Sequence, residues 1–157
     1  MTESEIAAFL TSSSPDVDVV VASEAGGAPE TAWGDSFFYY DPEGLPADRR
    51  LPFATIVTQD YPGFDTFSDL GRPGVFRLNV WVGRETFGGL FGEPGGAADH
   101  DFTALDTPLP HPTYAAQGWV SILNPGPRTT DLARTLLTEA LANAVTRHTL
   151  RSPTEGR

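Results

Sequence analysis

Hydrophobic and polar positions along the chain predict a helix at each end with strands between them. At the N-terminus, Thr2 and Glu5 fit a capping box, and apolar residues then recur with helical spacing. At the C-terminus, Thr129 or Thr130 is placed to cap a longer helix, and Asp131 suits its positive end. The apolar stripe of that helix comprises Leu132, Leu136, Leu137, Ala140, Leu141, Ala144 and Val145.

Five segments between these helices have the composition and spacing of β-strands. They are residues 17–21, 33–40, 53–58, 75–82 and 119–123. Strict alternation over 75–82 predicts a core face of Phe76, Leu78, Val80 and Val82. The opposite face carries Val75, Arg77, Asn79 and Trp81, so we expect it to be half open or to line a ligand site.

A short helix is predicted over residues 84–91, with Phe87, Leu90 and Phe91 facing the core. Residues 59–74 and 93–112 are rich in Gly, Pro and Asp and are predicted to be loops. This order favours an α+β fold with a mainly antiparallel sheet of about five strands, on which the N- and C-terminal helices pack. The length indicates a single domain over 1–157, with 149–157 as a frayed tail.

The amino-acid composition excludes several kinds of functional site. The chain has no Cys, which excludes disulfides, thiolate metal sites and cysteine nucleophiles. All of the 10 basic residues are Arg, so lysine-dependent chemistry is excluded as well. The net charge of −11 opposes binding to nucleic acid or to an anionic membrane. We find no long apolar run and no basic leader, so we expect a cytoplasmic protein, and no sequence motif implies a cofactor.

Polar residues beside the predicted core strands are the first candidates for a site, because buried polar groups must be satisfied there. The ligand-binding candidates are Arg72, Arg77, Asn79, Trp81, Arg84, Tyr114 and Gln117. The three arginines suit a small anionic ligand. The alternative is that they pair with Asp60, Asp65 and Asp69 in a structural ionic network, and the balance of charges favours that network.

Two further groups carry their own alternatives. Aromatic and amide residues near the last strand suit an apolar pocket with polar anchors, or plain core: Tyr61, Tyr114, Gln117 and Trp119. The metal candidates, which lie within twelve residues of one another, are His100, Asp101, Asp106 and His111. The alternative for this second group is turns and surface hydrogen bonds, which a loop of this composition favours.

Five segments resemble an uncharacterised bacterial family known as a domain of unknown function. They are WGDSFFYYDP (33–42), PFATIVTQDYPGFDTFSDL (52–70), RPGVFRLNVWVGRETFGGLFG (72–92), HDFTALD (100–106) and PHPTYAAQGWVSILNP (110–125). The order of an N-terminal helix, a strand and helix over LNVWVGRETF, a late strand over QGWVSIL and a C-terminal helix is also distantly similar to the MmcQ/YjbR group. That resemblance implies a compact α+β fold comparable to the frataxin-like CyaY architecture, and a DNA-binding role that the negative charge of this chain opposes.

The hypothesis we favour is a non-enzymatic binding domain for a small molecule or a protein partner. Its groove would lie beside Arg77, Asn79 and Trp81, because that strand face is mixed and no catalytic motif is present. The first alternative is a small metal-dependent enzyme that uses the 100–111 loop. The second is a DNA-binding protein, by analogy with the YjbR group.

Overall fold

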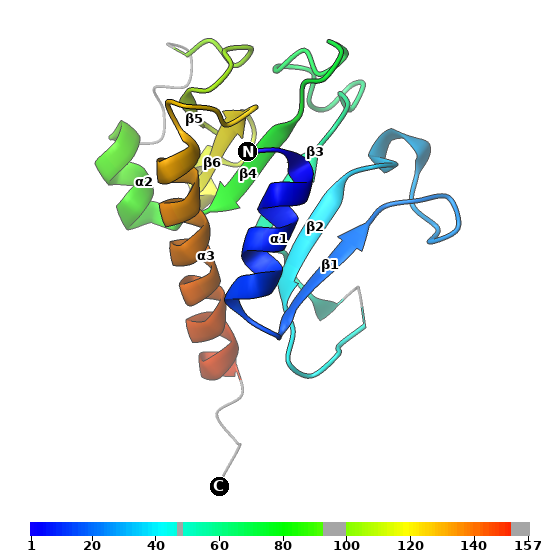
Figure 1. The fold of residues 1–157 in the computed structure, drawn as a ribbon, viewed down its shortest axis with the longest axis vertical. Helices are drawn as coiled ribbons and strands as arrows, with labels where there is room; N and C mark the ends of the chain where they lie inside the picture. Colours follow the sequence, from blue (N-terminus) through cyan, green and yellow to red (C-terminus); the bar gives the residue numbers. More distant parts are fainter. Residues whose placement is uncertain (47–48, 93–99, 152–157) are drawn as a thin grey trace, which may run out of the picture.

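The computed structural model describes residues 1–46, 49–92 and 100–151, which form an α+β fold (Figure 1). The helices are α1 (Glu3–Ser13), α2 (Arg84–Phe91) and α3 (Thr130–Arg151). The strands are β1 (Val17–Val21), β2 (Ser36–Tyr40), β3 (Ala54–Val57), β4 (Arg77–Trp81), β5 (Pro108–Pro110) and β6 (Trp119–Leu123). Short 3-10 turns are η1 (Glu30–Ala32) and η4 (Ala115–Gln117).

The strands of the described residues form one antiparallel sheet in the order β1-β2-β3-β4-β6-β5. Consecutive strands are neighbours from β1 to β4. The chain then passes through α2 to the outer strand β5 and returns, so β6 lies between β4 and β5. Register across the centre is continuous: Ile56 is opposite Leu78, and Leu78 is opposite Ile122.

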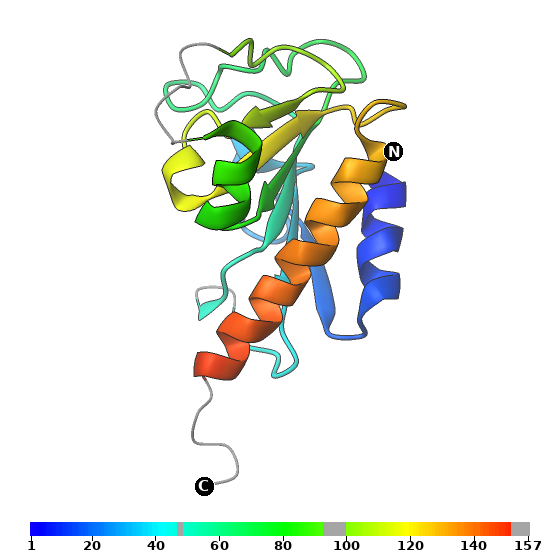
Figure 2. The same cartoon turned by 90° about the vertical axis from the view of Figure 1, so that its left-hand side faces the viewer.

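The helices α1 and α3 cover one face of this sheet. They lie in front of the strands in Figure 1 and side by side along one side of the sheet in Figure 2. Alternate residues of the central strands point at them and are fully or almost fully buried: Phe38, Ala54, Ile56, Leu78, Val80, Val120 and Ile122. These residues form the hydrophobic core. The predicted core face of the strand 75–82 is confirmed, since Phe76, Leu78, Val80 and Val82 are all buried.

Local signals explain where the helices begin. The capping box at α1 is formed as predicted, since the Thr2 hydroxyl accepts from the Glu5 N–H and the Glu5 carboxylate accepts from the Thr2 N–H. Before α3, the Asp106 carboxylate accepts from the backbone N–H groups of Gly126, Arg128 and Thr129 and from the Thr129 hydroxyl. These bonds, the Thr129 hydroxyl first, lower the pKa of Asp106 to about 2.

A close approach of two glycines fixes the path into β6. Gly118 has a φ of +87°, and a Cβ there would lie 2.6 Å from the carbonyl carbon of Gly83. The Gly118 carbonyl accepts from the N–H groups of Val82 and Gly83, at 2.9 and 3.2 Å. Gly118 therefore joins the end of β4 to the start of β6, and no larger residue fits this contact.

Three sequence predictions need correction. The sheet has a sixth strand, β5, within the segment 93–112 that was predicted to be a loop. Residues 93–99 of that segment lie outside the described part of the chain. Leu90 does not face the core but is 37% exposed, because α2 packs mainly through Phe87. The C-terminal tail does not begin at residue 149, since α3 continues to Arg151; residues 152–157 are not described. Among the described residues, no helix combines the length and apolar character needed to cross a membrane.

Candidate functional site

A row of polar side chains crosses the sheet on the face away from α1 and α3. Thr55 of β3 is paired in register with Asn79 of β4, and Asn79 with Ser121 of β6. Because side chains alternate along each strand, the residues beside the core positions must face this second surface. Asn79 and Ser121 are nevertheless buried, so this face is covered by other parts of the chain.

The amide of Asn79 is held in one orientation. Its Oδ1 accepts from the Arg77 Nε–H at 2.9 Å and from the Ser121 hydroxyl at 2.7 Å. A guanidinium can only donate, so the oxygen must face Arg77 and the amide nitrogen must face the other way. That nitrogen donates to the Thr55 hydroxyl at 3.0 Å, and its second N–H has no partner among the described residues.

Arg77 forms a buried ion pair with Asp65. The guanidinium is 2% exposed and the carboxylate 6% exposed, and two hydrogen bonds of 2.6 and 3.3 Å join them. The Ser68 hydroxyl accepts a further bond from Arg77 at 2.9 Å. The loop 59–74 supplies both partners, and paired backbone bonds between Tyr61 and Asp65 hold its turn. The ionic-network interpretation is therefore confirmed for this pair.

The other charged residues of the predicted network have different partners. Asp60 accepts from the Leu70 N–H at 3.0 Å, which fixes the loop locally. Arg72 lies 3.7 Å from the exposed Asp69 and donates to the carbonyl oxygens of Ser68 and Thr103. Arg77 and Arg84 line separate hollows and Arg72 lines neither, so the three arginines do not form a common anion site.

A second carboxylate, Asp35, is completely buried at the edge of this region. It accepts from the backbone N–H and the hydroxyl of Thr58, at 2.8 and 3.2 Å, and from the hydroxyl of Tyr61. Burial raises the pKa of Asp35, and burial together with Asp35 raises the pKa of Tyr61. Asp35 was not predicted, because its partners lie far away in the sequence and no local motif marks it.

His111 is buried beneath the aromatic residues of the same face, at 4% exposure. Its Nδ1 accepts from the backbone N–H groups of Thr113 and Tyr114, both at 3.1 Å. The neutral ring must therefore carry its proton on Nε2. Burial, with a smaller effect of the Arg77 charge, lowers the pKa of His111 to about 3. The ring is uncharged at neutral pH, and Nε2–H has no acceptor among the described residues.

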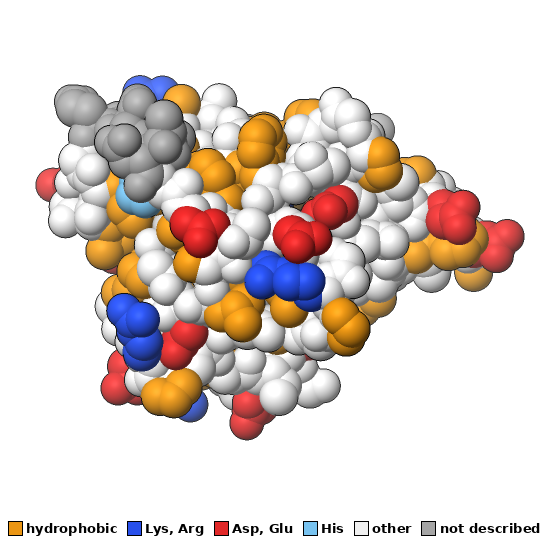
Figure 3. Space-filling model, turned by 90° about the horizontal axis from the view of Figure 1, so that it is seen from above, with side chains coloured by type: hydrophobic (Ala, Val, Ile, Leu, Met, Phe, Trp, Pro, Cys, Tyr) orange, Lys and Arg blue, Asp and Glu red, His pale blue; other side chains and the backbone are white. Residues whose placement is uncertain are grey.

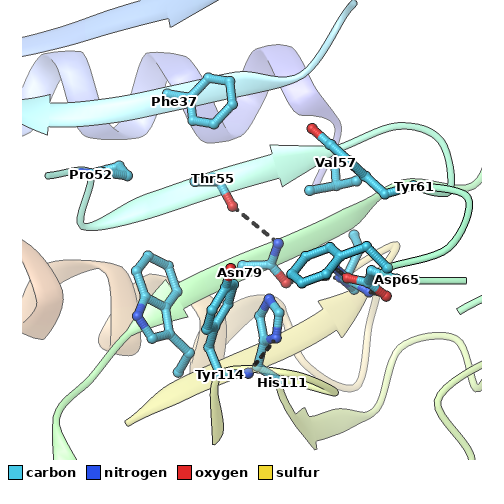
Figure 4. Close-up of a pocket in the computed structure, with 12 residues that line it drawn as sticks. Phe37, Pro52, Thr55, Val57, Tyr61, Asp65, Asn79, His111 and Tyr114 are labelled. Atoms are coloured by element: carbon cyan, nitrogen blue, oxygen red, sulfur yellow. Dashed lines mark hydrogen bonds and ion pairs between the residues drawn. The ribbon is translucent and has the colours of Figure 1, made fainter. Parts of the chain in front are cut away.

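These residues surround a cavity of about 270 Å³ on the face of the sheet away from α1 and α3 (Figure 4). Its lining is Phe37, Pro52, Thr55, Val57, Tyr61, Phe64, Asp65, Arg77, Asn79, His111, Tyr114 and Trp119. Figure 4 shows Asn79 and His111 at the floor, with the upper ring nitrogen of His111 pointing into the space beside Asn79. The rings of Phe64 and Tyr114, 6.3 Å apart and both exposed, form part of the rim. We call this space the sheet-face pocket.

The sheet-face pocket contains three of the seven predicted ligand-binding residues, namely Arg77, Asn79 and Tyr114. Trp81 and Arg84 line a different hollow, between α2 and α3, where Arg147 lies 4.6 Å from the Trp81 ring. Arg72 braces its loop, and Gln117 lies in η4 outside the lining. The aromatic hypothesis is better matched, since Tyr61, Tyr114 and Trp119 all line the pocket.

The predicted metal set of His100, Asp101, Asp106 and His111 is not brought together. His100 packs its ring against Phe91 and Phe102, and Asp101 accepts from Thr103. The Asp106 carboxylate accepts bonds at the start of α3, and His111 lies at the floor of the sheet-face pocket. Among the described residues, no three His, Asp or Glu side chains are grouped so that they could hold a metal ion.

Comparison with known protein families gives one match for this chain. Residues 1–153 match the family of unknown function DUF6194. The chain belongs to that family. No curated protein and no solved structure matches it. The resemblance to an uncharacterised bacterial family is thereby confirmed.

Proposed function

We propose that this member of DUF6194 is a non-enzymatic binding domain that holds a small, flat molecule in the sheet-face pocket. The observation that carries the proposal is the pocket itself, which combines aromatic walls with polar floor groups fixed by hydrogen bonds. Ligand sites in proteins typically have this composition, largely apolar with a few oriented polar anchors. The bonds within the floor keep those anchors in place before a ligand arrives, which reduces the entropy cost of binding.

The chemistry of the floor supports binding rather than catalysis. His111 uses Nδ1 to accept two backbone bonds and has a pKa of about 3, so at neutral pH it is neither a general base nor a charged acid. The Ser121 hydroxyl donates to Asn79 and is buried, which does not suit a nucleophile. Arg77 is already paired with Asp65.

The size of the pocket supports a ligand built on one ring. An apolar cavity of about 150 Å³ is enough to hold benzene. The sheet-face pocket, at about 270 Å³, has room for a ring with a small substituent. Stacking against residues such as Tyr114 and Trp119 would favour a planar molecule.

The test is a titration with soluble single-ring aromatics, acetophenone and phenol, followed by protein-observed NMR. We expect millimolar binding, as is usual for so few atoms, with the largest amide shifts at Val57, Tyr114 and Trp119. Val57→Phe should fill the pocket and abolish the shifts. Val145→Phe, at an exposed position of α3 on the other side of the sheet, is the matched control and should leave them unchanged. Shifts that are absent, or that survive Val57→Phe, would overturn the proposal.

The structure and charge give less support to a metal-dependent enzyme or to a DNA-binding protein. A metal-dependent enzyme would need ligands that the 100–111 loop does not bring together. DNA binding is opposed by the net charge of −11. On the end of the molecule in Figure 3, the Arg side chains drawn there stand apart rather than forming one basic surface. A YjbR-like architecture and a cytoplasmic location stay predictions.

A further inference from the structure

We propose that the ligand of the sheet-face pocket is an uncharged molecule that presents a hydrogen-bond acceptor, such as a carbonyl oxygen, to the Nε2–H of His111. This inference rests on the proposed function and names the chemistry that the pocket would select. It is carried by a buried histidine whose outward nitrogen has a fixed proton and no partner among the described residues. The amide N–H of Asn79 that lacks a partner is a second donor in the lining of the pocket.

The proton on Nε2 is fixed by backbone geometry. The N–H groups of Thr113 and Tyr114 both point at Nδ1, and the Thr113 hydroxyl lies 3.2 Å from the same atom. A proton on Nδ1 would face two donors that cannot turn away. The other tautomer is therefore excluded in the folded chain, and the nitrogen that faces the pocket can only donate.

Donors and acceptors on the floor are not balanced. The Oδ1 of Asn79 already accepts two bonds, and both carboxylate oxygens of Asp65 accept from Arg77. Four of the five guanidinium N–H groups are used by the same bonds and by Ser68. The lining groups left without a partner among the described residues include N–H donors on His111 and Asn79 and the fifth N–H of Arg77. A ligand with an acceptor atom can accept hydrogen bonds from these donors. A ligand without one displaces water from the donors and gives them no new partner.

Charge on the floor favours a neutral ligand. Asp65 neutralises Arg77, and His111 is uncharged at neutral pH. An anion would lose its hydration without meeting an uncompensated positive charge, and burying an ion on such terms is unfavourable. A cation would face the two N–H donors. An uncharged acceptor avoids both penalties.

Acetophenone and α-methylstyrene provide the test, because they share a shape and differ in carrying C=O or C=CH₂. Benzoate serves as the anionic probe. We expect acetophenone to bind about tenfold more tightly than α-methylstyrene, because loss of one bond to a buried donor costs about that factor. We expect benzoate to bind more weakly than acetophenone. Equal affinity of the first pair, or tighter binding of benzoate, would overturn the inference and leave the proposed function standing. Binding of none of the three would overturn both.

His111→Asn separates the pocket donor from the structural role of the ring. The Asn Oδ1 can accept the same backbone N–H bonds from two and three residues ahead, as in an Asx-turn, but it places no donor deep in the pocket. We expect the preference for acetophenone to fall below about threefold. His100→Asn, the same change outside the pocket, should keep the full preference. A preference retained in His111→Asn would overturn the assignment of the donor.

Histidine nitrogen NMR tests the inference on the unmodified protein, independently of the variant. The chain has 3 histidines, so their ring signals can be assigned by substitution. We expect His111 to show the Nε2–H tautomer, with that proton moving downfield when acetophenone is added. An Nδ1–H tautomer, or an Nε2–H signal unmoved by bound acetophenone, would overturn the proposal.

Discussion

Arg77 is the largest side chain that the structure buries almost completely, and its burial depends on partners from a loop. Asp65 neutralises its charge, and Ser68 and Asn79 accept further N–H groups. A buried ion pair of this kind adds little net stability by itself, but the loss of one partner leaves the other charged and dry. The Arg77–Asp65 ion pair therefore holds the loop 59–74 against the sheet, and replacing either residue alone is expected to destabilise the protein.

Asp65→Asn should lower the free energy of unfolding by about 3–5 kcal/mol, since it removes the charge that balances buried Arg77. Urea denaturation followed by circular dichroism measures this change.

Asp69→Asn is the matched control in the same loop. Its side chain is 64% exposed and lies 3.7 Å from Arg72. Asn tolerates the positive φ of this position, so the change should stay below about 1 kcal/mol. A similar small loss for Asp65→Asn would contradict the role given to the ion pair.

At this scale, the sequence allowed the ion pair to be predicted but not its neighbours. Three Asp and three Arg in one stretch made a buried pair a natural hypothesis. Asp35 could not be found in this way, because Thr58 and Tyr61 reach it only after the strands have paired. His111 was noticed for its metal-binding chemistry, yet its role depends on two backbone N–H groups whose direction no composition reveals.

At the scale of elements, the contact of Gly118 with Gly83 determines how β6 enters the sheet. The backbone at Gly118 is left-handed, and a Cβ would collide with backbone atoms that cannot move aside. Tyr114 and Trp119, on either side of this turn, supply one wall of the sheet-face pocket.

Gly118→Ala should lower the free energy of unfolding by about 2 kcal/mol or more, through the left-handed backbone and the collision together. It should also weaken acetophenone binding, because the wall residues move with the turn. Thermal and urea denaturation measure the first effect, and NMR titration the second.

Gly88→Ala in α2 is the control for this prediction. A Cβ at Gly88 meets nothing within 4 Å, and Ala is the better helix former by about 1 kcal/mol. This variant should be unchanged or slightly more stable. If Gly118→Ala behaved in the same way, the close contact would have no structural importance.

Elements with strong local signals were predictable, and those defined by distant partners were not. The capping box predicted the start of α1, and the predicted strand 119–123 coincides with β6. β5 was missed because Pro-Leu-Pro cannot supply a full ladder, although an outer strand tolerates proline. The inward side of α2 was misjudged at Leu90, since this eight-residue helix meets the core through Phe87 and, less completely, Phe91.

At the scale of the whole molecule, the two faces of the sheet respond differently to acid. The face beneath α1 and α3 is apolar and carries no titratable group in its buried core cluster. The other face contains His111, Asp35 and the Arg77–Asp65 pair, all largely removed from water. Acid therefore acts on the stability of the whole domain partly through the pocket.

His111 should make the protein less stable as the pH falls from about 6.5 toward 3. Over that range the unfolded chain binds a proton at this ring and the folded chain does not, so the free energy of unfolding decreases with falling pH. The slope from this one group is at most about 1.4 kcal/mol per pH unit. Urea denaturation between pH 7 and pH 4.5, values chosen to lie on either side of the usual His pKa of about 6.5, measures it.

Comparison with His111→Asn isolates this contribution. Asp35 acts in the opposite direction, because a raised pKa makes the folded chain bind a proton more readily than the unfolded one. Both proteins contain Asp35, so the difference between their curves belongs to His111. Parallel curves for the two proteins would show that His111 takes up a proton in the folded state.

The position of β6 has a consequence for how the chain is made. β4 is made before β5 and β6, but its neighbour on one side is β6, which emerges later than every other described strand. Until then, a growing chain carries an unpaired ladder edge beside apolar residues that α3 has not yet covered, a condition that invites association with other chains. Arrival of β6 pairs this edge and brings Trp119 to the pocket at the same time, and α3 then follows to cover the apolar face. Completion of the sheet and completion of the pocket therefore depend on the same late strand.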